Sequence, residues 1–310
     1  MSDRVVCGLA TFRQDRAVLE LATVASSPAG RELFSGVVIV DSLGSGELPA
    51  ELERHGLTPF VRYYDFPRNL GAAGNLHFRL LLAAGLRADY LFTLNHDGHL
   101  DLAVVAALAR FARERGLAAA YPLRRIAPNL FDLTGTRSFP LRPHRLARSR
   151  LPPTAALPAH WSSSNGALYS LSPTWAGVRP PLGLWMGFED YGWGLALERA
   201  GFAQAVCLDA ELDSGYDFRP QRGLAGGRPL ADKPPWLSYY LARNLLLLAT
   251  RYFPSPRLAV LAAARIVREV AVSLALRRHR RRRLGLLARG TLDGLRGRTG
   301  LVVPPPSGER

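Results

Sequence analysis

Two histidines and two aspartates lie within six residues at the end of the stretch LFTLNHDGHLD, which runs from Leu91 to Asp101. The front of this stretch is apolar, so the polar side chains follow a predicted buried strand. Zinc normally takes three or four nitrogen or sulfur ligands at paired spacings, and the two cysteines lie far away, at positions 7 and 207. One carboxylate suits Mg²⁺ or Mn²⁺ better, because phosphate oxygens can fill the other coordination positions. We therefore predict Asp97 as the metal ligand and the two histidines as bystanders.

A second pair of acids, Glu189 and Asp190, begins the segment EDYGWGLALERAGF, which is predicted to form an amphipathic helix ended by Gly201. Acids are favourable at a helix N-terminus for electrostatic reasons alone. A carboxylate at this position can also accept the proton of an attacking hydroxyl. The residues by themselves leave both explanations open.

Two more polar segments follow predicted strands. In VVIVDSLGSGE, Asp41 ends an apolar run and could accept from a nucleobase N–H, although Asp-Ser before Gly is also ordinary turn chemistry. In RNLGAAGN, residues 68–75, Gly71 and Gly74 allow close backbone approach before a helix whose N-terminus can bind an anion. Helix capping by Asn69 is the alternative. The segment has neither the lysine and spacing of a P-loop nor the glycine spacing of a dinucleotide fingerprint.

The elements that must position these residues alternate between strand and helix. Strands are predicted at residues 4–12, 36–47 (running into a Gly/Ser loop), 58–66, 89–95 and 118–123, and helices at 17–26, 50–56, 75–87 and 102–116. This spacing indicates an α/β fold with a parallel sheet covered on both faces. Such sheets bind ligands at the carboxyl ends of their strands. The rule brings Arg13, Asp41 and the Asn95–Asp97 stretch to one edge.

Composition excludes some classes of protein. The chain has 310 residues, 48% of them hydrophobic, and can bury one large core or two smaller ones. Its net charge is +15, but residues 240–310 carry 15 arginines against three acids, so the rest is close to neutral. A nucleic-acid-binding protein would need a second basic stripe to support this arm. The two cysteines are too few for a disulfide framework, and the N-terminus lacks the length of a signal peptide, so we expect a cytoplasmic protein.

The C-terminal part has long apolar faces interrupted by Pro254 and Pro256, and it contains the arginine cluster RRHRRRR. No uninterrupted apolar run reaches the eighteen or so residues that a membrane-spanning helix needs. An apolar face beside clustered arginines favours a helix lying on an anionic membrane surface. A helix packed on the rest of the protein, with a solvated basic end, and a phosphate-binding arm are the alternatives.

Taken in order, VDSLGS, NLGAAGN, NHDG, SSSNGALYSLS and the Glu-Asp helix resemble family-2 inverting glycosyltransferases of GT-A fold, and bacterial rhamnosyltransferase-like members in particular. The resemblance extends through Tyr239-Tyr240, Arg243-Asn244 and GTLDGLRGRTG, nearly the whole chain. It implies a Rossmann-like, mostly parallel sheet with helices on both faces and a C-terminal amphipathic helical segment. The implied domains are a GT-A domain at 1–235 (nucleotide-binding half 1–125, acceptor-side half 126–235), a basic membrane-associating segment at 236–300 and a disordered tail at 301–310.

The resemblance also implies residue roles. Asp190 would be the catalytic base and Glu189 a supporting hydrogen-bond acceptor. Asp97 would hold Mg²⁺ or Mn²⁺, although Asn95 stands where the family usually has an acid and leaves the metal requirement open. The implied nucleotide-sugar-binding residues are Thr11, Arg13, Asp41, Asn69, Gly71, Gly74, Asn75 and Asn95.

On the acceptor side, the implied residues are Asn165, Gly166 and Trp193. Stacking on a sugar is one use for Trp193, and packing within this half is the alternative. The family often has a histidine after the Glu-Asp helix, where this chain offers Asp213 or Asp217.

The expected activity is transfer of a sugar from a nucleotide-sugar donor, with dTDP-rhamnose as the first guess, to a glycan or lipid-linked acceptor. Inversion, cell-wall or surface polysaccharide synthesis and the inner face of the membrane belong to the same expectation. One alternative is a degenerate, non-catalytic binding protein, which Asn95 favours and the intact Glu-Asp pair opposes. Another is a nucleotidyltransferase, which should carry a basic glycine-rich loop after the first strand. The sequence LATFRQDR at that point is different.

Overall fold

The computed structural model describes residues 3–44, 46–136, 144–213, 220–221, 230–231 and 233–305. The chain forms two compact units. The first contains Met1–Pro180 and Asp190–Gly215, and the second contains Pro181–Glu189 and Tyr216–Arg310. The domain boundaries expected from the sequence, at residues 125, 235 and 300, stay predictions.

Strands and helices alternate through the first part of the chain, as the hydrophobic pattern predicts. In chain order up to the fifth strand they are β1 (Val5–Thr11), α1 (Asp15–Ala25), α2 (Pro28–Leu33), β2 (Phe34–Ser42), α3 (Leu48–Arg54), β3 (Val61–Phe66), α4 (Gly71–Gly85), β4 (Tyr90–Asn95), α5 (Leu102–Arg115) and β5 (Ala119–Ala127). After β5 follow β6 (Leu130–Asp132), β7 (Arg145–Ala147), η1 (Arg148–Arg150), β8 (Ala156–Pro158), β9 (Ala167–Ser170), α6 (Ser172–Trp175), α7 (Glu189–Arg199) and β10 (Gln204–Asp213).

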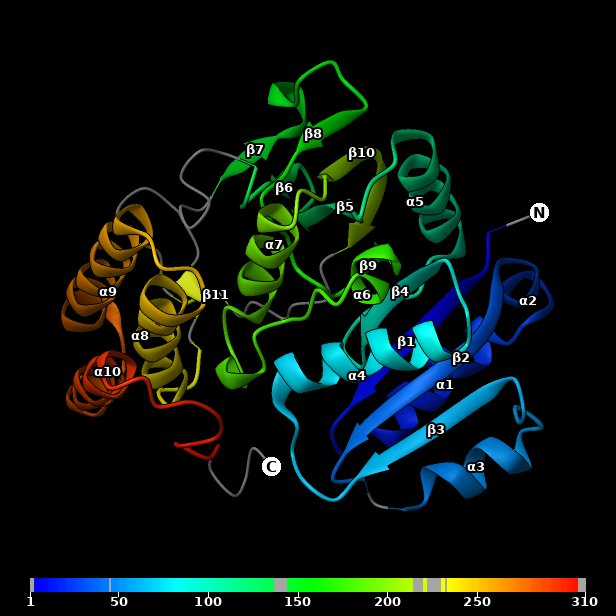
Figure 1. The fold of residues 1–310 in the computed structure, drawn as a ribbon, viewed down its shortest axis with the longest axis horizontal. Coiled ribbons are helices and arrows are strands. Elements are labelled where there is room, and N and C mark those ends of the chain that lie inside the picture. The colour runs from blue at the N-terminus through cyan, green and yellow to red at the C-terminus, as the bar shows by residue number, and fades with distance from the viewer. Residues whose placement is uncertain are drawn as a thin grey trace. The chain divides into compact units, whose positions relative to one another are not determined.

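The main sheet has the strand order β3-β2-β1-β4-β9-β5-β10-β8 (Figure 1). The first four strands are parallel, and so are β5 and β10. The motif SSSNGALYSLS contains β9, a strand of four residues, but does not predict that it lies antiparallel between β4 and β5. The longest pairings are therefore parallel, as the resemblance implies, and β9 joins the two parallel parts through shorter antiparallel pairings.

The register brings the ends of the first four strands together. Thr11 pairs with Asp41, Asp41 pairs with Asp65, and Ala10 pairs with Asn95. We call the ends of β1 to β4, at Thr11, Asp41, Asp65 and Asn95, the carboxyl edge. Because parallel strands end at the same side of a sheet, the polar residues predicted from three separate motifs do lie along this edge.

Helices cover both faces of the sheet, and the alternation of side chains along the strands decides which residue faces which layer. Cys7 and Leu9 of β1 pack with the helices α1 and α5, for example against Val18 and Val105. Val6, one position along, belongs to the opposite core with α4 and α7. Burial of a large apolar side chain stabilises the fold by about 1.5–3 kcal/mol. The two layers pack against the sheet that carries the carboxyl edge.

Local capping explains part of the opening stretch. The Asp101 carboxylate accepts hydrogen bonds from the backbone N–H groups of Ala103 and Val104, at 2.9 and 3.3 Å, and so begins α5. Gly116, at φ 61°, ends the same helix in the left-handed conformation that glycine adopts most easily. Asp101 is therefore a helix cap, which leaves Asp97 as the acid available for chemistry.

The second unit is mainly helical. Its elements are η2 (Leu182–Leu184), β11 (Pro220–Gln221), β12 (Leu230–Ala231), α8 (Leu237–Leu247), η3 (Leu248–Tyr252), α9 (Pro256–Leu276) and α10 (Arg280–Leu295). In the part of the chain that the structure describes, no helix has the length and apolarity needed to cross a bilayer. The Tyr240 hydroxyl accepts from the N–H of Val302 and of Val303, both at 3.1 Å, within the expected tail. Residues 306–310 lie outside the described residues.

Candidate active site

Asp41, the second-last residue of β2, is a fully buried carboxylate. The Tyr63 hydroxyl donates to its Oδ2 at 2.8 Å. Burial raises the pKa of Asp41 to about 6, and the hydrogen bond from Tyr63 opposes this shift. Its other oxygen, Oδ1, is buried and has no hydrogen-bond partner among the described residues. An unpaired buried acceptor costs about 1–3 kcal/mol, so Asp41 is suited to accept from a ligand.

Thr11 and Arg13 lie at and just beyond the end of β1. The Thr11 hydroxyl accepts from the backbone N–H of Gln14 at 3.3 Å. Arg13 is exposed, has a φ of 57° and places its guanidinium 5.6 Å from the ring centre of Phe12. A left-handed backbone is uncommon for a residue with a side chain. The turn therefore carries strain next to the carboxyl edge.

Residues 69–75 form the start of α4. The Asn69 side chain accepts from the N–H of Gly71 at 2.8 Å, but the N-cap residue of α4 is Leu70, whose side chain makes no capping hydrogen bond. Gly71 has a φ of 66°. A Cβ on Gly74 would lie 3.0 Å from the Leu70 Cβ, so close packing against the turn explains this glycine. Asn75 donates to the Val40 carbonyl at 3.1 Å, and its buried Oδ1 has no partner among the described residues.

Asp97 follows β4 as an exposed carboxylate. The Asn165 amide donates to its Oδ1 at 3.3 Å and accepts from the Asn95 backbone N–H at 2.9 Å. The structure shows no cluster of three or more His, Cys, Asp or Glu able to hold a metal among the residues that it describes. A single oriented carboxylate fits Mg²⁺ or Mn²⁺, which take oxygen ligands and keep water or phosphate in the remaining positions.

Asp190 lies at the start of α7 in the first unit. Ser164 donates to its carboxylate from both the hydroxyl and the backbone N–H. Burial raises the pKa of Asp190, while the bonds from Ser164 and the charges of Arg124 and Arg79 oppose the shift. Its Oδ1 is buried without a partner in the described part of the chain. Such a carboxylate has one fixed oxygen and one oxygen available to take a proton.

Glu189 begins α7 but belongs to the second unit. It follows a segment in which Trp185, Gly187 and Phe188 all have positive φ, at 59°, 83° and 64°. For the two aromatic residues this backbone is strained, and such strain is typical of functional segments. The role of Glu189 as a supporting acceptor stays a prediction.

The three residues expected on the acceptor side have different surroundings. Asn165 is buried and contacts the Asp97 loop, as described above. Gly166 has a φ of 87°, and a Cβ there would lie 2.3 Å from a Leu212 methyl, so only glycine fits. Trp193 is 1% exposed, and its ring meets that of Tyr169 edge-on with centres 6.2 Å apart. Packing, and not stacking on a sugar, is the use that the structure shows for Trp193.

Sequence reasoning missed several polar residues near these acids. Arg79, on α4, is buried and donates to the carbonyls of Gly8 and Leu94, at 3.1 and 3.2 Å. Burial lowers the pKa of Arg79 to about 10. A lone arginine within the apolar run LHFRLLLAAG is the signal that could have revealed it. Ser164 and Arg124 have no comparable signal, because their partners lie far away in the sequence.

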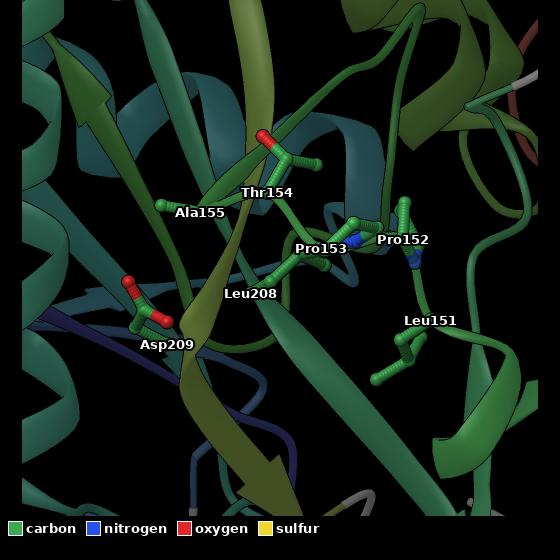
Figure 2. Close-up of a pocket in the computed structure, with 7 residues that line it drawn as sticks. All are labelled: Leu151, Pro152, Pro153, Thr154, Ala155, Leu208 and Asp209. Atoms are coloured by element: carbon green, nitrogen blue, oxygen red, sulfur yellow. The ribbon is translucent and has the colours of Figure 1, made fainter.

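Beyond α7, Asp213 forms a two-pronged ion pair with Arg125, with N–O distances of 2.6 and 2.7 Å. Asp217, the other candidate for the place of the family's histidine, lies outside the described residues. A separate cavity of about 410 Å³ lies at the β10 bulge, lined by Leu208, Asp209 and the stretch from Leu151 to Ala155 (Figure 2). No predicted site residue lines this cavity.

Comparison with known proteins finds similarity to glycosyltransferases. No protein-family model matches the chain. GlfT1, a galactofuranosyltransferase of Mycobacterium tuberculosis, is 29% identical over 256 residues, which cover 79% of this chain and 81% of the relative.

Solved structures show the same architecture. TarS of S. aureus, in complex with UDP-GlcNAc, matches with a TM-score of 0.55 and 11% identity over 93% of this chain and 80% of that chain. The mannosyltransferase PcManGT of Pyrobaculum calidifontis, in complex with GDP-Man and Mn²⁺, matches with a TM-score of 0.54 and 16% identity over 95% and 88%. At these identities the structures establish the fold. The chain therefore has the GT-A fold of these glycosyltransferases, and its similarity to the galactofuranosyltransferase supports the resemblance seen in the sequence.

Proposed function

We propose that the chain transfers a sugar from a nucleoside-diphosphate sugar, with inversion, to a hydroxyl of a glycan or lipid-linked acceptor in cell-wall polysaccharide synthesis. One observation carries this proposal. Within the first unit, consecutive residues of one loop hold two acids: Ser164 bonds Asp190, and Asn165 bonds Asp97. An acid beside a diphosphate site and a second acid able to take a proton are the two requirements of this chemistry.

In the proposed reaction, the acceptor oxygen attacks the anomeric carbon from the face opposite the leaving nucleoside diphosphate. Asp190 takes the hydroxyl proton, the bond from the anomeric carbon to the diphosphate oxygen breaks, and the diphosphate keeps the electron pair. Burial raises the pKa of Asp190 and so strengthens it as a base. A divalent ion held by Asp97 would offset the charge of the leaving diphosphate.

The nucleoside is proposed to lie along the carboxyl edge. Uracil, thymine and guanine each carry an N–H that the unpaired Oδ1 of Asp41 could accept. Asn75 offers a second buried acceptor that lacks a partner in the described chain. Arg13 is exposed at the end of β1 and offers a positive charge for a phosphate. These three residues give the proposed donor site both hydrogen-bonding and electrostatic selectivity.

Two donor sugars have separate support. Rhamnose from dTDP-rhamnose follows from the sequence resemblance, and galactofuranose follows from the name of the relative GlfT1. The nucleotide distinguishes them, because dTDP and UDP differ at the base and at the ribose 2′-hydroxyl. We retain both, and the binding experiment separates them.

Calorimetric titration of the full chain with UDP, dTDP and GDP, each with Mn²⁺ and with chelator, tests the proposal. We expect one nucleotide to bind with Mn²⁺ and to lose at least tenfold in affinity in chelator or after Asp97→Asn. Asp209→Asn, an exposed acid at the separate cavity, serves as the control and should bind like the unchanged protein. Failure of all three nucleotides to bind would reject the donor class.

We also propose that the second unit binds the anionic inner face of the membrane through α9. Five exposed apolar residues follow one another on one side of this helix, at spacings of three and four: Val260, Ala264, Val267, Ala271 and Leu274. We call them the α9 stripe. Its valines are 68% and 67% exposed, and its leucine is 50% exposed. A soluble helix normally turns such residues inward.

The charge beside the α9 stripe indicates what covers it. Arg257 and Arg268 are exposed on the same helix, Arg278 is exposed just after its end, and the exposed Arg280 to Arg282 follow. A second copy of the chain would bring arginines against arginines, whereas anionic lipid headgroups attract them. Sedimentation with vesicles containing phosphatidylglycerol should carry the protein down, and vesicles of phosphatidylcholine alone should not.

Val267→Glu in the α9 stripe should reduce binding to the anionic vesicles several-fold, because it places a repelled charge in the apolar face. Val24→Glu, a substitution at an exposed valine of α1, is the control. Truncation at residue 276 is a poor test, because Asp293 of α10 accepts from the Tyr239 hydroxyl at 2.8 Å and helps to hold the second unit together. If the Val267→Glu variant and the unchanged protein bound the anionic vesicles equally, the α9 stripe would not be the membrane-binding surface.

A further inference from the structure

Ser164 and Asn165 are adjacent residues whose side chains reach two different acids of the first unit. Both side chains are buried, with Ser164 9% and Asn165 4% exposed. Ser164 donates twice to Asp190, and Asn165 donates once to Asp97. Neither residue offers a group that could replace an acid in the chemistry. Their contacts suggest that they set where the acids lie.

Asn165 also gives the Asp97 carboxylate a defined partner. The Asn165 Oδ1 accepts from the Asn95 backbone N–H at 2.9 Å, which fixes the amide and directs its Nδ2 to Asp97 at 3.3 Å. A Cβ on Gly98 would lie 2.9 Å from the same Oδ1, so a glycine is needed for this approach. One carboxylate is thus oriented by an amide from another segment.

The loop that carries the pair is also anchored by hydrogen bonds to residues other than the two acids. The Thr93 carbonyl accepts from the Gly166 N–H at 2.7 Å, and the Thr93 hydroxyl donates to the Ala167 carbonyl at 3.1 Å. Arg124 donates to the Asn165 carbonyl at 2.6 Å. Thr93 is fully buried and Arg124 is 5% exposed. Rigid anchoring of this kind is what a positioning element requires.

We propose that Ser164 and Asn165 are positioning residues that fix the base Asp190 and the metal-binding acid Asp97 relative to each other. This inference deepens the proposed function and rests on it. Asn165 acts on binding of the donor through Asp97. Ser164 acts on the transfer step through Asp190, because its two hydrogen bonds favour the ionised carboxylate. We therefore expect Asn165 to control the affinity for the donor and Ser164 to control the rate of transfer.

For Asn165, the test is nucleotide affinity by calorimetry, with Mn²⁺ and with chelator. Asn165→Ala should weaken Mn²⁺-dependent binding by about tenfold or more and leave binding in chelator unchanged, as loss of a group that orients a metal ligand does. Ser163→Ala is the matched control. It removes the hydroxyl that accepts from the Asn165 N–H at 3.3 Å in the same loop, and it keeps the Asn165 side chain.

For Ser164, the test is the pH profile of kcat. Ser164→Ala should lower kcat by at least tenfold with an unchanged KM for the donor, and it should move the acidic limb of the profile to higher pH. The limb moves because burial of Asp190 is then opposed less strongly. Ser164→Thr keeps the hydroxyl and should restore part of the loss.

The outcomes separate the two proposals. If the unchanged protein binds no nucleotide, the proposed function fails. If it binds and transfers, but Asn165→Ala keeps its Mn²⁺ dependence and Ser164→Ala keeps its pH profile, only the positioning inference fails. A uniform loss of stability, affinity and rate in both variants would show a structural role and would also overturn the inference.

Discussion

In the first unit, Asp41 and Asn75 each have one buried oxygen without a hydrogen-bond partner among the described residues. In the second unit, the side chains of Arg243 and Asn244 donate hydrogen bonds to backbone carbonyls. Asn244 donates to the carbonyls of Leu184, Met186 and Gly187, at 3.0, 2.8 and 2.6 Å. Complete pairing of buried polar groups stabilises a fold. Incomplete pairing costs free energy unless a ligand supplies the partner. The contrast thus separates a candidate ligand-binding edge, in the first unit, from the hydrogen bonds of Arg243 and Asn244 that stabilise the second unit.

The largest effect should come from Asp190→Asn. We expect the transfer rate to fall about a thousandfold, because the amide cannot take the acceptor proton. Nucleotide affinity should change little, since the substitution keeps the shape of the side chain. Transfer assays and calorimetry on the same preparation check both statements, with Asp209→Asn as the control. A rate close to that of the unchanged protein would remove Asp190 from the role of base.

The stabilising role of Asn244 in the second unit is tested by the substitution Asn244→Ala. Loss of hydrogen bonds to one buried and two partly buried carbonyls should lower the free energy of unfolding by about 3 kcal/mol. Urea denaturation followed by circular dichroism measures this. Thr250→Ala, which removes an exposed hydroxyl in the same unit, should cost less than about 0.5 kcal/mol. Similar losses of unfolding free energy in the two variants would contradict a stabilising role for the Asn244 hydrogen bonds.

The smallest effect concerns Asp41 and depends on pH. With a pKa of about 6, Asp41 should lose most of its charge by pH 5, and nucleotide affinity should then fall about tenfold from its value at pH 7. Calorimetry at pH 5, 6 and 7 checks this. Asp41→Asn should bind about tenfold more weakly at pH 7 and show a flat profile, and a profile as steep as that of the unchanged protein would assign the titration to another group.

Stability should respond to pH in the opposite direction. The folded state raises the pKa of Asp41 above its usual value of 3.8. The contribution of this group to stability is therefore fully present below about pH 4 and is lost as the pH rises to about 6. Urea denaturation over this range, compared with Asp41→Asn, isolates the contribution. As the pH rises, nucleotide affinity should increase while the contribution of Asp41 to stability decreases. This opposite dependence is expected of a residue that serves binding at the expense of stability.

Much of the first unit was predictable because its information is local. Runs such as RVVCGLATF and DYLFTLN specify buried strands, and Asp101 and Gly116 mark the ends of a helix. Once the strands are parallel, the meeting of Thr11, Asp41 and Asn95 at one edge follows from geometry. The candidate donor residues could thus be assigned from the sequence, and their roles stay predictions.

The remaining features depend on segments distant in the sequence. The insertion of β9 between β4 and β5, and the grouping of residues 181–189 with the second unit, have no local signature. The local sequence also does not tell whether Trp193 packs within the protein or stacks on a sugar. The sequence by itself determined the order of the strands and helices and the chemistry at their ends, because periodicity and turn chemistry act over a few residues. Tertiary structure alone decided which buried polar groups find partners, because the bonds from Ser164 to Asp190 and from Asn165 to Asp97 join residues brought together only by packing.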